Sequence, residues 1–194
     1  MVAVDGSTAM LDRLRQRLAA TGPARLSVLQ ADLREPLELE APVDAVFSVA
    51  TLHWLPDHAA VFASLAAALR PGGLLRAEWG GAGDLAGVDD ALADLGLLTV
   101  DERLTFADAD QTAQHLADAG FTDVDVDVDL VPDPLHLEPG AQLEAYLATV
   151  VLGAVLDPLP ADQRPAVVRD VAARLPAPVV DDVRLRAAAR LPSS

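Results

Sequence analysis

The stretch Met1-Val2-Ala3-Val4-Asp5-Gly6-Ser7, residues 1–7, places a short β-prone run directly before an acidic residue, a glycine and a serine that can cap a helix. Apolar residues then recur at helical spacing until the Thr-Gly-Pro sequence at 21–23 stops the pattern. These apolar residues are Met10, Leu11, Leu14 and Leu18. A strand, a tight turn and a helix in this order predict the first unit of an α/β fold.

The same alternation of strand and helix continues along the chain. Apolar runs of strand length lie at 26–30, 43–50 and 74–79. Helical periodicity covers 57–70, 84–95, 108–119, 138–156 and 161–175. Val alternates with Asp over 121–131, which is typical of a half-exposed edge strand, and 179–191 reads as a closing strand. The order predicts a single α/β domain over 1–194, with a doubly wound, Rossmann-like, mostly parallel sheet.

The composition indicates a folded protein that binds a small molecule. Apolar residues make up 52% of the 194 residues and charged residues 23%, as in packed domains. A formal charge of -16 disfavours nucleic acid and anionic membranes as partners. The absence of Cys excludes disulfides and thiolate chemistry. Because neither a signal-peptide pattern nor a long apolar stretch is present, we expect a cytoplasmic location.

The candidate functional residues lie where predicted strands end, which is where ligands bind in open α/β sheets. Asp5 follows the first strand, and its carboxylate is placed to accept hydrogen bonds from two ribose hydroxyls. Gly6 lets the backbone turn away closely. A carboxylate that stabilises a helix N-terminus through the helix dipole explains Asp5 equally well, so both interpretations stay open.

Two further strand ends carry candidate residues. Asp32 and Leu33 follow the strand at 26–30, where the carboxylate could accept from an exocyclic amine and the leucine could cover a purine face. His53 and Trp54 follow the strand at 43–50, where a substrate would lie, and they are the candidate catalytic residues. A solvated loop is the alternative for Asp32, and packing in the core or in a lid is the alternative for Trp54.

These segments together resemble one known family. The residues that carry the resemblance are 2–7 with Met10, then 31–33, 47–54 and the turn at 69–73. They look like class I S-adenosylmethionine-dependent methyltransferases and are most similar to the trans-aconitate methyltransferase-like group. The resemblance implies S-adenosylmethionine as the cofactor and methyl transfer to a small molecule, with a carboxylic acid as the acceptor that this group suggests.

The resemblance also implies roles for particular residues. Asp5 is expected to bind the ribose, Met10 to pack by the adenine, and Asp32 to meet the adenine amine. The predicted cofactor-binding set is completed by Gly6, Leu33 and Val49. His53 and Trp54 match residues near the methyl-transfer face, so they are expected to shape the substrate pocket.

The family's sheet has the strand order 3-2-1-4-5-7-6 with an antiparallel last strand, and nothing here matches its first strand or its glycine-rich loop. The expected sheet therefore lacks a central strand between 2–4 and 43–50. One explanation is that the true start lies upstream of Met1. The other is a truncated protein in which neighbouring strands close the gap, or in which a partner chain or a second copy completes the sheet.

Two other functions remain as alternatives. A catalytically inactive methyltransferase fold that acts as an interaction protein is the non-enzymatic one, and the missing loop favours it. A nicotinamide-dependent oxidoreductase is the enzymatic one, which the turn at 71–73 and the closing strand disfavour. The four His residues lack a clustered ligand pattern, so no metal site is predicted. His53 or His58 would serve as a general base only for a hydroxyl or amine acceptor.

Overall fold

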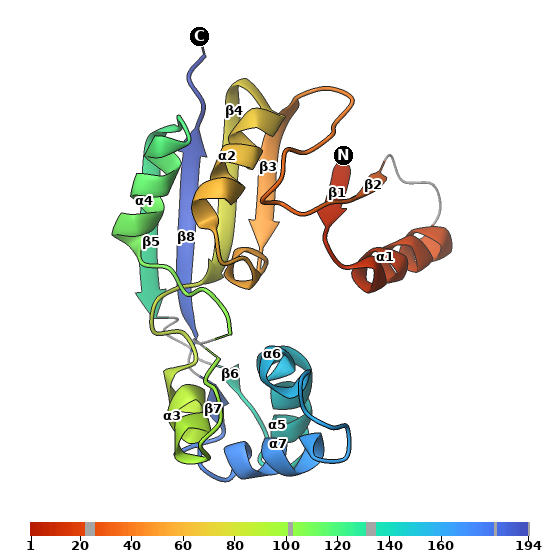
Figure 1. The fold of residues 1–194 in the computed structure, drawn as a ribbon, viewed down its shortest axis with the longest axis vertical. Coiled ribbons are helices and arrows are strands. Elements are labelled where there is room, and N and C mark those ends of the chain that lie inside the picture. The colour runs from red at the N-terminus through yellow and green to blue at the C-terminus, as the bar shows by residue number, and fades with distance from the viewer. Residues whose placement is uncertain (22–25, 101–102, 131–134, 181, 194) are drawn as a thin grey trace.

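The computed structural model describes residues 1–21, 26–100, 103–130, 135–180 and 182–193. It has two lobes (Figure 1), one built around a β-sheet and the other mainly helical. The buried apolar residues form two clusters that correspond to these lobes. The expectation of one domain over 1–194 stays a prediction.

The N-terminal unit is a strand, a helix and a second, parallel strand. β1 (Val2–Asp5) leads into α1 (Thr8–Thr21), and β2 (Ser27–Gln30) pairs with β1 in parallel. Asp5 lies opposite Gln30, so the carboxyl ends of the two strands are adjacent. α1 packs against both strands and buries Leu11, as the spacing of its apolar residues predicts.

The main sheet has four strands in the order β3-β4-β8-β5. β3 (Val43–Val49) is parallel to β4 (Leu69–Gly80), whereas β8 (Val183–Arg190) is antiparallel to both of its neighbours, β4 and β5 (Thr122–Leu130). The closing strand is therefore antiparallel, as expected, and β5 is an edge strand. The sheet is mixed: β3, β4 and β5 run in one direction, as expected for a mostly parallel sheet, and β8 runs in the opposite direction between β4 and β5.

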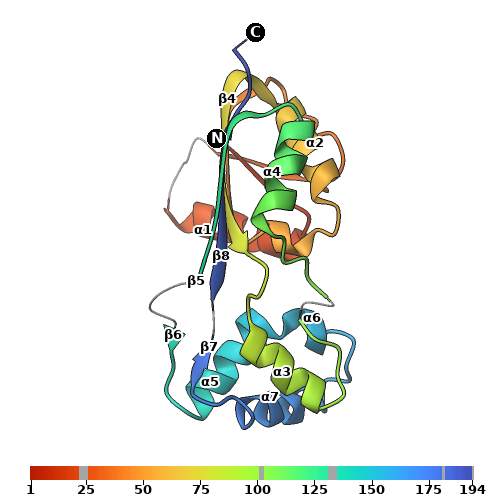
Figure 2. The same ribbon diagram turned by 90° about the vertical axis from the view of Figure 1, so that its left-hand side faces the viewer.

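Two helices cover one face of this sheet. α2 (His58–Ala68) and α4 (Ala109–Asp118) lie on the same side of the strands, and α1 lies on the other side (Figure 2). Both helices begin with an aspartate cap, since Asp57 accepts from the Ala60 N–H and Asp108 from the Gln111 N–H. The core beneath them contains the fully buried side chains of Phe62, Trp79, Leu75, Leu116 and Leu185.

β4 begins earlier than its sequence suggests. The Pro-Gly-Gly sequence at 71–73 was expected to form a turn, but Leu69 already pairs with Val43 and the strand continues through an irregular register. Gly72 has φ +75°, a conformation that glycine adopts without strain, and its N–H donates to the carbonyl of Pro192 (2.9 Å). The glycine therefore forms an irregularity within a long strand, and the strand bends without ending.

The sheet is divided between β1 and β3. Within the described residues, β1 pairs with β2 and β3 pairs with β4, and no pairing joins the two groups. β1 and β3 run in the same direction and stand apart (Figure 1). Phe47 and Val49 on β3 are 81% and 48% exposed. The division falls where the expected strand order lacks its central strand, and the doubly wound sheet is accordingly found in two parts.

The helical lobe is formed by the segments after β4 and β5. Its helices are α3 (Ala86–Asp94), α5 (Ala141–Tyr146), α6 (Gly153–Leu156) and α7 (Arg164–Ala172), with a two-stranded antiparallel sheet of β6 (Leu135–His136) and β7 (Val179–Val180). The helix expected over 138–156 is interrupted by a π-helical turn, Leu147–Val151. There the Thr149 hydroxyl donates to the Ala145 carbonyl (2.7 Å), a local bond that perturbs regular helix.

Candidate functional site

Asp5 lies at the carboxyl end of β1 and holds the turn that begins α1. Its Oδ1 accepts from the Ser7 backbone N–H (2.7 Å), and the Ser7 hydroxyl accepts from the Met10 N–H (3.4 Å). The capping role that the sequence left open is thus occupied by one carboxylate oxygen. Oδ2 makes no hydrogen bond to the described residues. Asp5 can therefore maintain the turn and still present an oxygen to a ligand.

The turn after β1 is tied to the end of β2. The Ala31 N–H donates to the Asp5 carbonyl (3.3 Å), and the Gln30 side-chain amide donates to the Gly6 carbonyl (3.3 Å) and to the Thr8 hydroxyl (2.9 Å). A Cβ added at Gly6 would lie 3.7 Å from the Ala31 carbonyl oxygen, an ordinary contact. The fold itself thus has room for a side chain at position 6, and the need for glycine there stays a prediction about a ligand.

Asp32 lies just beyond β2 and forms an ion pair that was not predicted from the sequence. Arg34 donates from Nε to Oδ1 (3.0 Å) and from Nη2 to Oδ2 (2.6 Å), and its backbone N–H also donates to Oδ1 (3.0 Å). These hydrogen bonds lower the pKa of Asp32 to about 2, so the carboxylate is ionised at neutral pH. A carboxylate offers about four acceptor positions, so an amine can still bind beside Arg34.

The remaining predicted cofactor-binding residues are apolar. Met10 is 54% exposed on the first turn of α1, close to the turn formed by Asp5. Leu33 is partly buried against the main core. Val49, near the end of β3, lies across the gap in the sheet. The pairing of β1 with β2 therefore places Asp5 and Gly6 beside the strand end that leads to Asp32, and among the described residues no strand pairing joins Val49 to them.

His53 lies in the segment that connects β3 to α2. Beyond β3, Ala50 adopts φ +52°, an uncommon conformation for a residue with a Cβ, and the chain enters a 3-10 helix, Leu52–Trp54. The Gly80 N–H donates to His53 Nδ1 (3.3 Å), and the Thr105 N–H donates to the His53 carbonyl (2.8 Å). Burial, aided by the positive charge of Arg184, lowers the pKa of His53 to about 4.

Trp54 is 52% exposed and contacts the His53 ring, with the two ring centroids 5.6 Å apart. Burial in the core, one of the two interpretations of the sequence, is therefore excluded for this side chain. Its exposed face, beside His53 and the carboxyl end of β3, leaves it available to a substrate or to a covering segment.

His58, the other histidine considered as a general base, is a core residue. It is 4% exposed, its Nε2 lies 2.9 Å from the Leu52 carbonyl oxygen, and its ring packs edge-on against Trp79. Burial lowers its pKa, so the neutral ring is favoured. His58 thus supports the 3-10 helix that carries His53, and it does not reach a surface where a substrate could bind.

A polar group near the lobe junction was not predicted. Asp84, 8% exposed, accepts from the Val183 N–H (2.8 Å) and links the loop after β4 to the start of β8. Burial, and next to it the charge of Asp182, raises the pKa of Asp84 to about 6. Arg184 pairs with Asp182 (2.6 Å) beside it. In the sequence, Asp84 is marked only by its position soon after the glycines that end β4, and this pattern is too weak to identify it as a buried aspartate.

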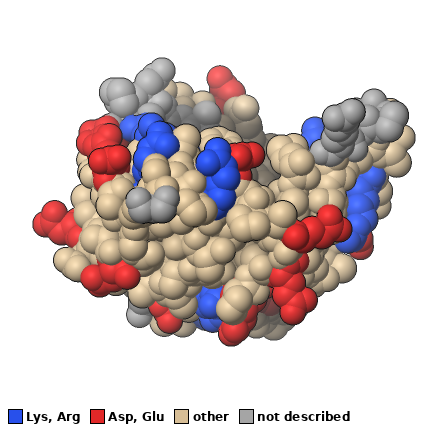
Figure 3. Space-filling model, turned by 90° about the horizontal axis from the view of Figure 1, so that it is seen from above, with Lys and Arg blue, Asp and Glu red and all other residues tan. Residues whose placement is uncertain are grey.

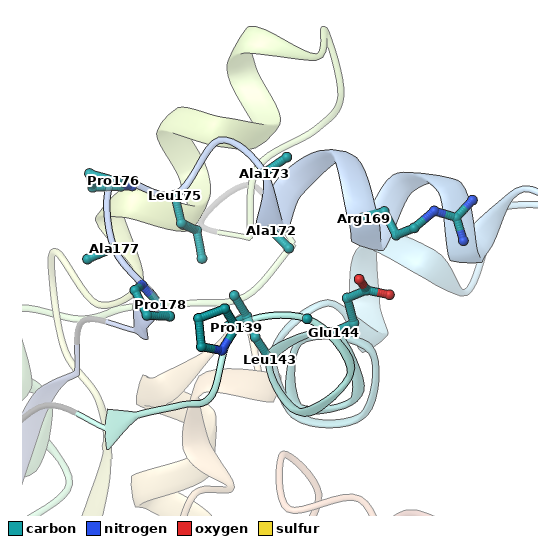
Figure 4. Close-up of a pocket in the computed structure, with 11 residues that line it drawn as sticks. Pro139, Leu143, Glu144, Arg169, Ala172, Ala173, Leu175, Pro176, Ala177 and Pro178 are labelled. Atoms are coloured by element: carbon teal, nitrogen blue, oxygen red, sulfur yellow. The ribbon is translucent and has the colours of Figure 1, made fainter.

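The structure also contains a cavity of about 350 Å³ in the helical lobe, away from the strand ends. It is lined by α5, α7 and the proline-containing segment after α7, with Glu144 and Arg169 on one side and Pro139, Pro176 and Pro178 on the other (Figure 4). None of the predicted site residues lines it. It therefore does not bear on the strand-end site.

The charged side chains show no single dominant patch on the face seen from above. Acidic and basic groups are interspersed there (Figure 3). Ion pairs of the described residues include Arg186 with Glu78 (3.0 Å). In the described part of the chain, no group of three or more His, Asp or Glu residues is arranged to hold a metal ion. No helix among the same residues is long and apolar enough to span a membrane.

Comparison with known proteins confirms the family resemblance over the N-terminal part of the chain. Residues 1–73 match the family model described as a methyltransferase domain. A trans-aconitate 2-methyltransferase from Azoarcus sp. (strain BH72) is 44% identical over 75 residues, which are 39% of this chain and 27% of that protein. A malonyl-[acyl-carrier protein] O-methyltransferase from Xylella fastidiosa (strain M23) is 39% identical over 75 residues, or 39% of this chain and 25% of that protein. The matched segment spans about a quarter of the length of these relatives.

Solved structures share the fold over nearly the whole chain. The YcgJ protein of Bacillus subtilis aligns with a TM-score of 0.68 at 10% identity, covering 100% of this chain and 82% of that one. Phosphoethanolamine N-methyltransferase 2 of Haemonchus contortus, solved with phosphomonomethylethanolamine and S-adenosylhomocysteine, aligns with a TM-score of 0.63 at 19% identity, covering 98% and 43%. At such identities the likeness establishes an α/β methyltransferase-like fold and leaves the substrate open.

Proposed function

We propose that this chain, whose residues 1–73 match a methyltransferase domain, takes part in S-adenosylmethionine-dependent methyl transfer to a small molecule that carries a carboxylate. The observation that carries this proposal is the pair of carboxylates at the adjacent carboxyl ends of β1 and β2. Asp5 can present its Oδ2 to a ligand at the end of β1. Asp32, just beyond the end of the paired strand β2, carries an ionised carboxylate. Such an edge is where an α/β sheet binds a nucleoside.

The residues present fit the nucleoside part of the cofactor. Asp5 Oδ2 can accept from a ribose hydroxyl, Asp32 can accept from the adenine amine, and exposed Met10 and partly buried Leu33 offer apolar surface to the purine. For the methionine part, the described residues around β1 and β2 contain no glycine-rich loop. The chain therefore supplies a nucleoside half-site most clearly.

When bound, the cofactor supplies an electrophilic methyl group on a sulfonium. The residues of the chain would position the cofactor and the acceptor. Holding two reactants at attack distance can provide most of the acceleration of such a reaction. The three strand ends of β1, β3 and β4 point the same way, toward the second lobe (Figure 1). A cofactor bound at Asp5 and an acceptor bound near His53 and Trp54 would then meet at the carboxyl-end edge of the strands.

A carboxylate acceptor agrees with the site. The names of two relatives describe methylation of trans-aconitate and of a malonyl group, both of which carry carboxylates. A carboxylate is ionised at neutral pH and needs no general base, whereas a hydroxyl or amine acceptor would need one. His53, with a pKa of about 4, would be a weak base at pH 7. We therefore propose a carboxylate acceptor, because its methylation does not require a general base.

Calorimetric titration with S-adenosylmethionine tests the cofactor site. We expect micromolar binding to the wild-type chain and its loss in Asp5→Ala, because the variant removes the ribose acceptor. The matched control is Asp12→Ala, which removes an exposed carboxylate of α1 that pairs with Arg15 (2.8 Å). Binding that is absent from the wild type, or equally weakened in both variants, would contradict the proposal. Titration with a nicotinamide dinucleotide in parallel tests the oxidoreductase alternative.

The acceptor class is tested by transfer of a labelled methyl group to trans-aconitate, used as a tricarboxylate probe. Product that forms with trans-aconitate and not with the matched triol or amine analogues would support a carboxylate acceptor. Transfer that requires an amine or hydroxyl would contradict it, even if the cofactor binds as proposed.

The divided sheet favours a second candidate function, that of an interaction protein. Parallel strands β1 and β3 each have one unpaired edge among the described residues, and Phe47 beside the gap is 81% exposed. An extended apolar segment of a second copy, running parallel to β3, would satisfy both edges. Light scattering should then show a concentration-dependent dimer that Phe47→Glu weakens. A strictly monomeric wild-type chain would exclude a second copy as the occupant.

A further inference from the structure

The hydrogen bond at His53 Nδ1 fixes which nitrogen of the ring carries the proton. The partner is the backbone N–H of Gly80, 3.3 Å away, and a backbone N–H can only donate. Nδ1 must therefore present its lone pair. In the neutral imidazole the proton then resides on Nε2, which becomes a hydrogen-bond donor.

The surroundings keep this ring neutral and in place. Burial is the main cause of the low pKa of His53, about 4, and the positive charge of Arg184 and the neighbouring ring of His58 act in the same direction. The ring contacts the rings of Trp54 and Phe106, with centroid distances of 5.6 and 6.1 Å. At pH 7 the side chain is thus a neutral ring of defined orientation.

The Nε2 nitrogen is available to a ligand. It forms no hydrogen bond to the described residues, and it is not among the buried polar atoms of that part of the chain that lack a partner. Solvent therefore reaches it, although the side chain is partly buried. It lies just beyond β3, where Ala50 turns the chain sharply with φ +52° and Gly80 ends β4. Unusual backbone conformations of this kind are concentrated at functional sites.

We propose that His53 Nε2–H donates a hydrogen bond to an oxygen of the methyl acceptor and so selects a carboxylate over an amine. This inference rests on the proposed methyl transfer. One carboxylate oxygen accepts from Nε2, and the other forms a bond to the methyl carbon as the sulfur–carbon bond breaks. The products are a methyl ester and a neutral thioether, and no proton is transferred. A protonated amine has only N–H donors, so it cannot accept a hydrogen bond from the Nε2–H.

The tautomer can be measured without cofactor or substrate. Nitrogen-15 NMR of the histidine-labelled wild-type chain reports whether each ring nitrogen carries a proton, and His53→Gln identifies the His53 signals among those of the four histidines. We expect an unprotonated Nδ1 and a protonated Nε2 from pH 6 to pH 8. A protonated Nδ1, or a doubly protonated ring at pH 7, would overturn the inference whether or not the chain is a methyltransferase.

The selection of a carboxylate is tested by His53→Phe and His53→Gln with trans-aconitate as the probe. Losing a hydrogen bond to a charged group should raise KM about 10-fold to 100-fold in the phenylalanine variant, while kcat changes little. Glutamine retains an N–H donor and should recover part of the affinity, and His136→Gln, at an exposed histidine of β6, serves as the control. If turnover is undetectable, calorimetric binding of trans-aconitate to the same variants provides the readout. Equal affinity of wild type and His53→Phe, or no binding to any of them, would refute the assignment.

Discussion

Replacing Asp84 with asparagine should change how the stability of the protein depends on pH. Asp84 is 8% exposed, so its charged form is desolvated at the junction of the two lobes, and the hydrogen bond from the Val183 N–H offsets only part of that cost. Its pKa is raised from 3.8 to about 6 in the folded chain. The folded state therefore binds a proton more tightly than the unfolded state does. Asparagine keeps an oxygen for the Val183 N–H and cannot ionise.

The magnitude follows from the two pKa values. A shift from 3.8 to about 6 corresponds to about 3 kcal/mol, at about 1.4 kcal/mol per unit. Because the folded pKa is the higher one, this stability is fully present below pH 3.8 and is lost as the pH rises through about 6. Roughly 2 kcal/mol of the loss falls between pH 4 and pH 7. Relative to wild type, Asp84→Asn should gain that amount over the same interval.

Urea denaturation of both proteins at pH 4, 5, 6 and 7 measures the difference directly. Asp90→Asn, at an exposed aspartate of α3, is the matched control for the general effect of removing a carboxylate. The reasoning would be refuted if the free-energy difference between Asp84→Asn and wild type stayed constant with pH, or changed no more than the difference for the control.

Further effects on stability should be visible in denaturant midpoints. Gly80→Ala should cost about 1 to 3 kcal/mol, because the added Cβ would lie 2.7 Å from Phe106 Cε1 and also meet the Asp84 carboxylate. Gly153→Ala, where nothing lies within 4 Å of the added atom, should instead stabilise α6 by up to about 1 kcal/mol, and a loss of stability there would contradict the packing described. Asp108→Ala should cost about 1 kcal/mol, because the Gln111 N–H loses its cap, and an unchanged midpoint would show that the cap contributes nothing.

The sequence predicted those helices and strands that are determined by residues close together in the chain. The caps at Asp57 and Asp108 fall where the sequence places helix starts, and the alternation of Val and Asp marks β5 as an edge strand. In each case a side chain and a backbone group a few residues apart, or a period of two residues, determine the outcome. The order of the strands came from the family resemblance and agrees with the two groups of strands observed.

Features that depend on distant contacts could not be read from the sequence. Asp84 acquires its raised pKa from burial, which exceeds the opposing effect of the hydrogen bond from Val183, 99 residues away, and His53 acquires its orientation from Gly80, 27 residues away. The pairing of Asp32 with Arg34 is local, yet several exposed carboxylates have a nearby arginine, so the pattern alone did not distinguish it. Tertiary structure decides which of many similar residues become perturbed.

The central claim is that the carboxyl ends of β1 and β2 bind the nucleoside part of S-adenosylmethionine. The most direct measurement compares the dissociation constants of S-adenosylmethionine and 5′-methylthioadenosine, which keeps the nucleoside and lacks the amino acid part. Because the residues at this edge are placed for ribose and adenine, we predict that the two constants agree to within about tenfold, or 1.4 kcal/mol, and that Asp5→Ala abolishes both. Binding of S-adenosylmethionine without measurable binding of methylthioadenosine, or binding of neither, would contradict the account.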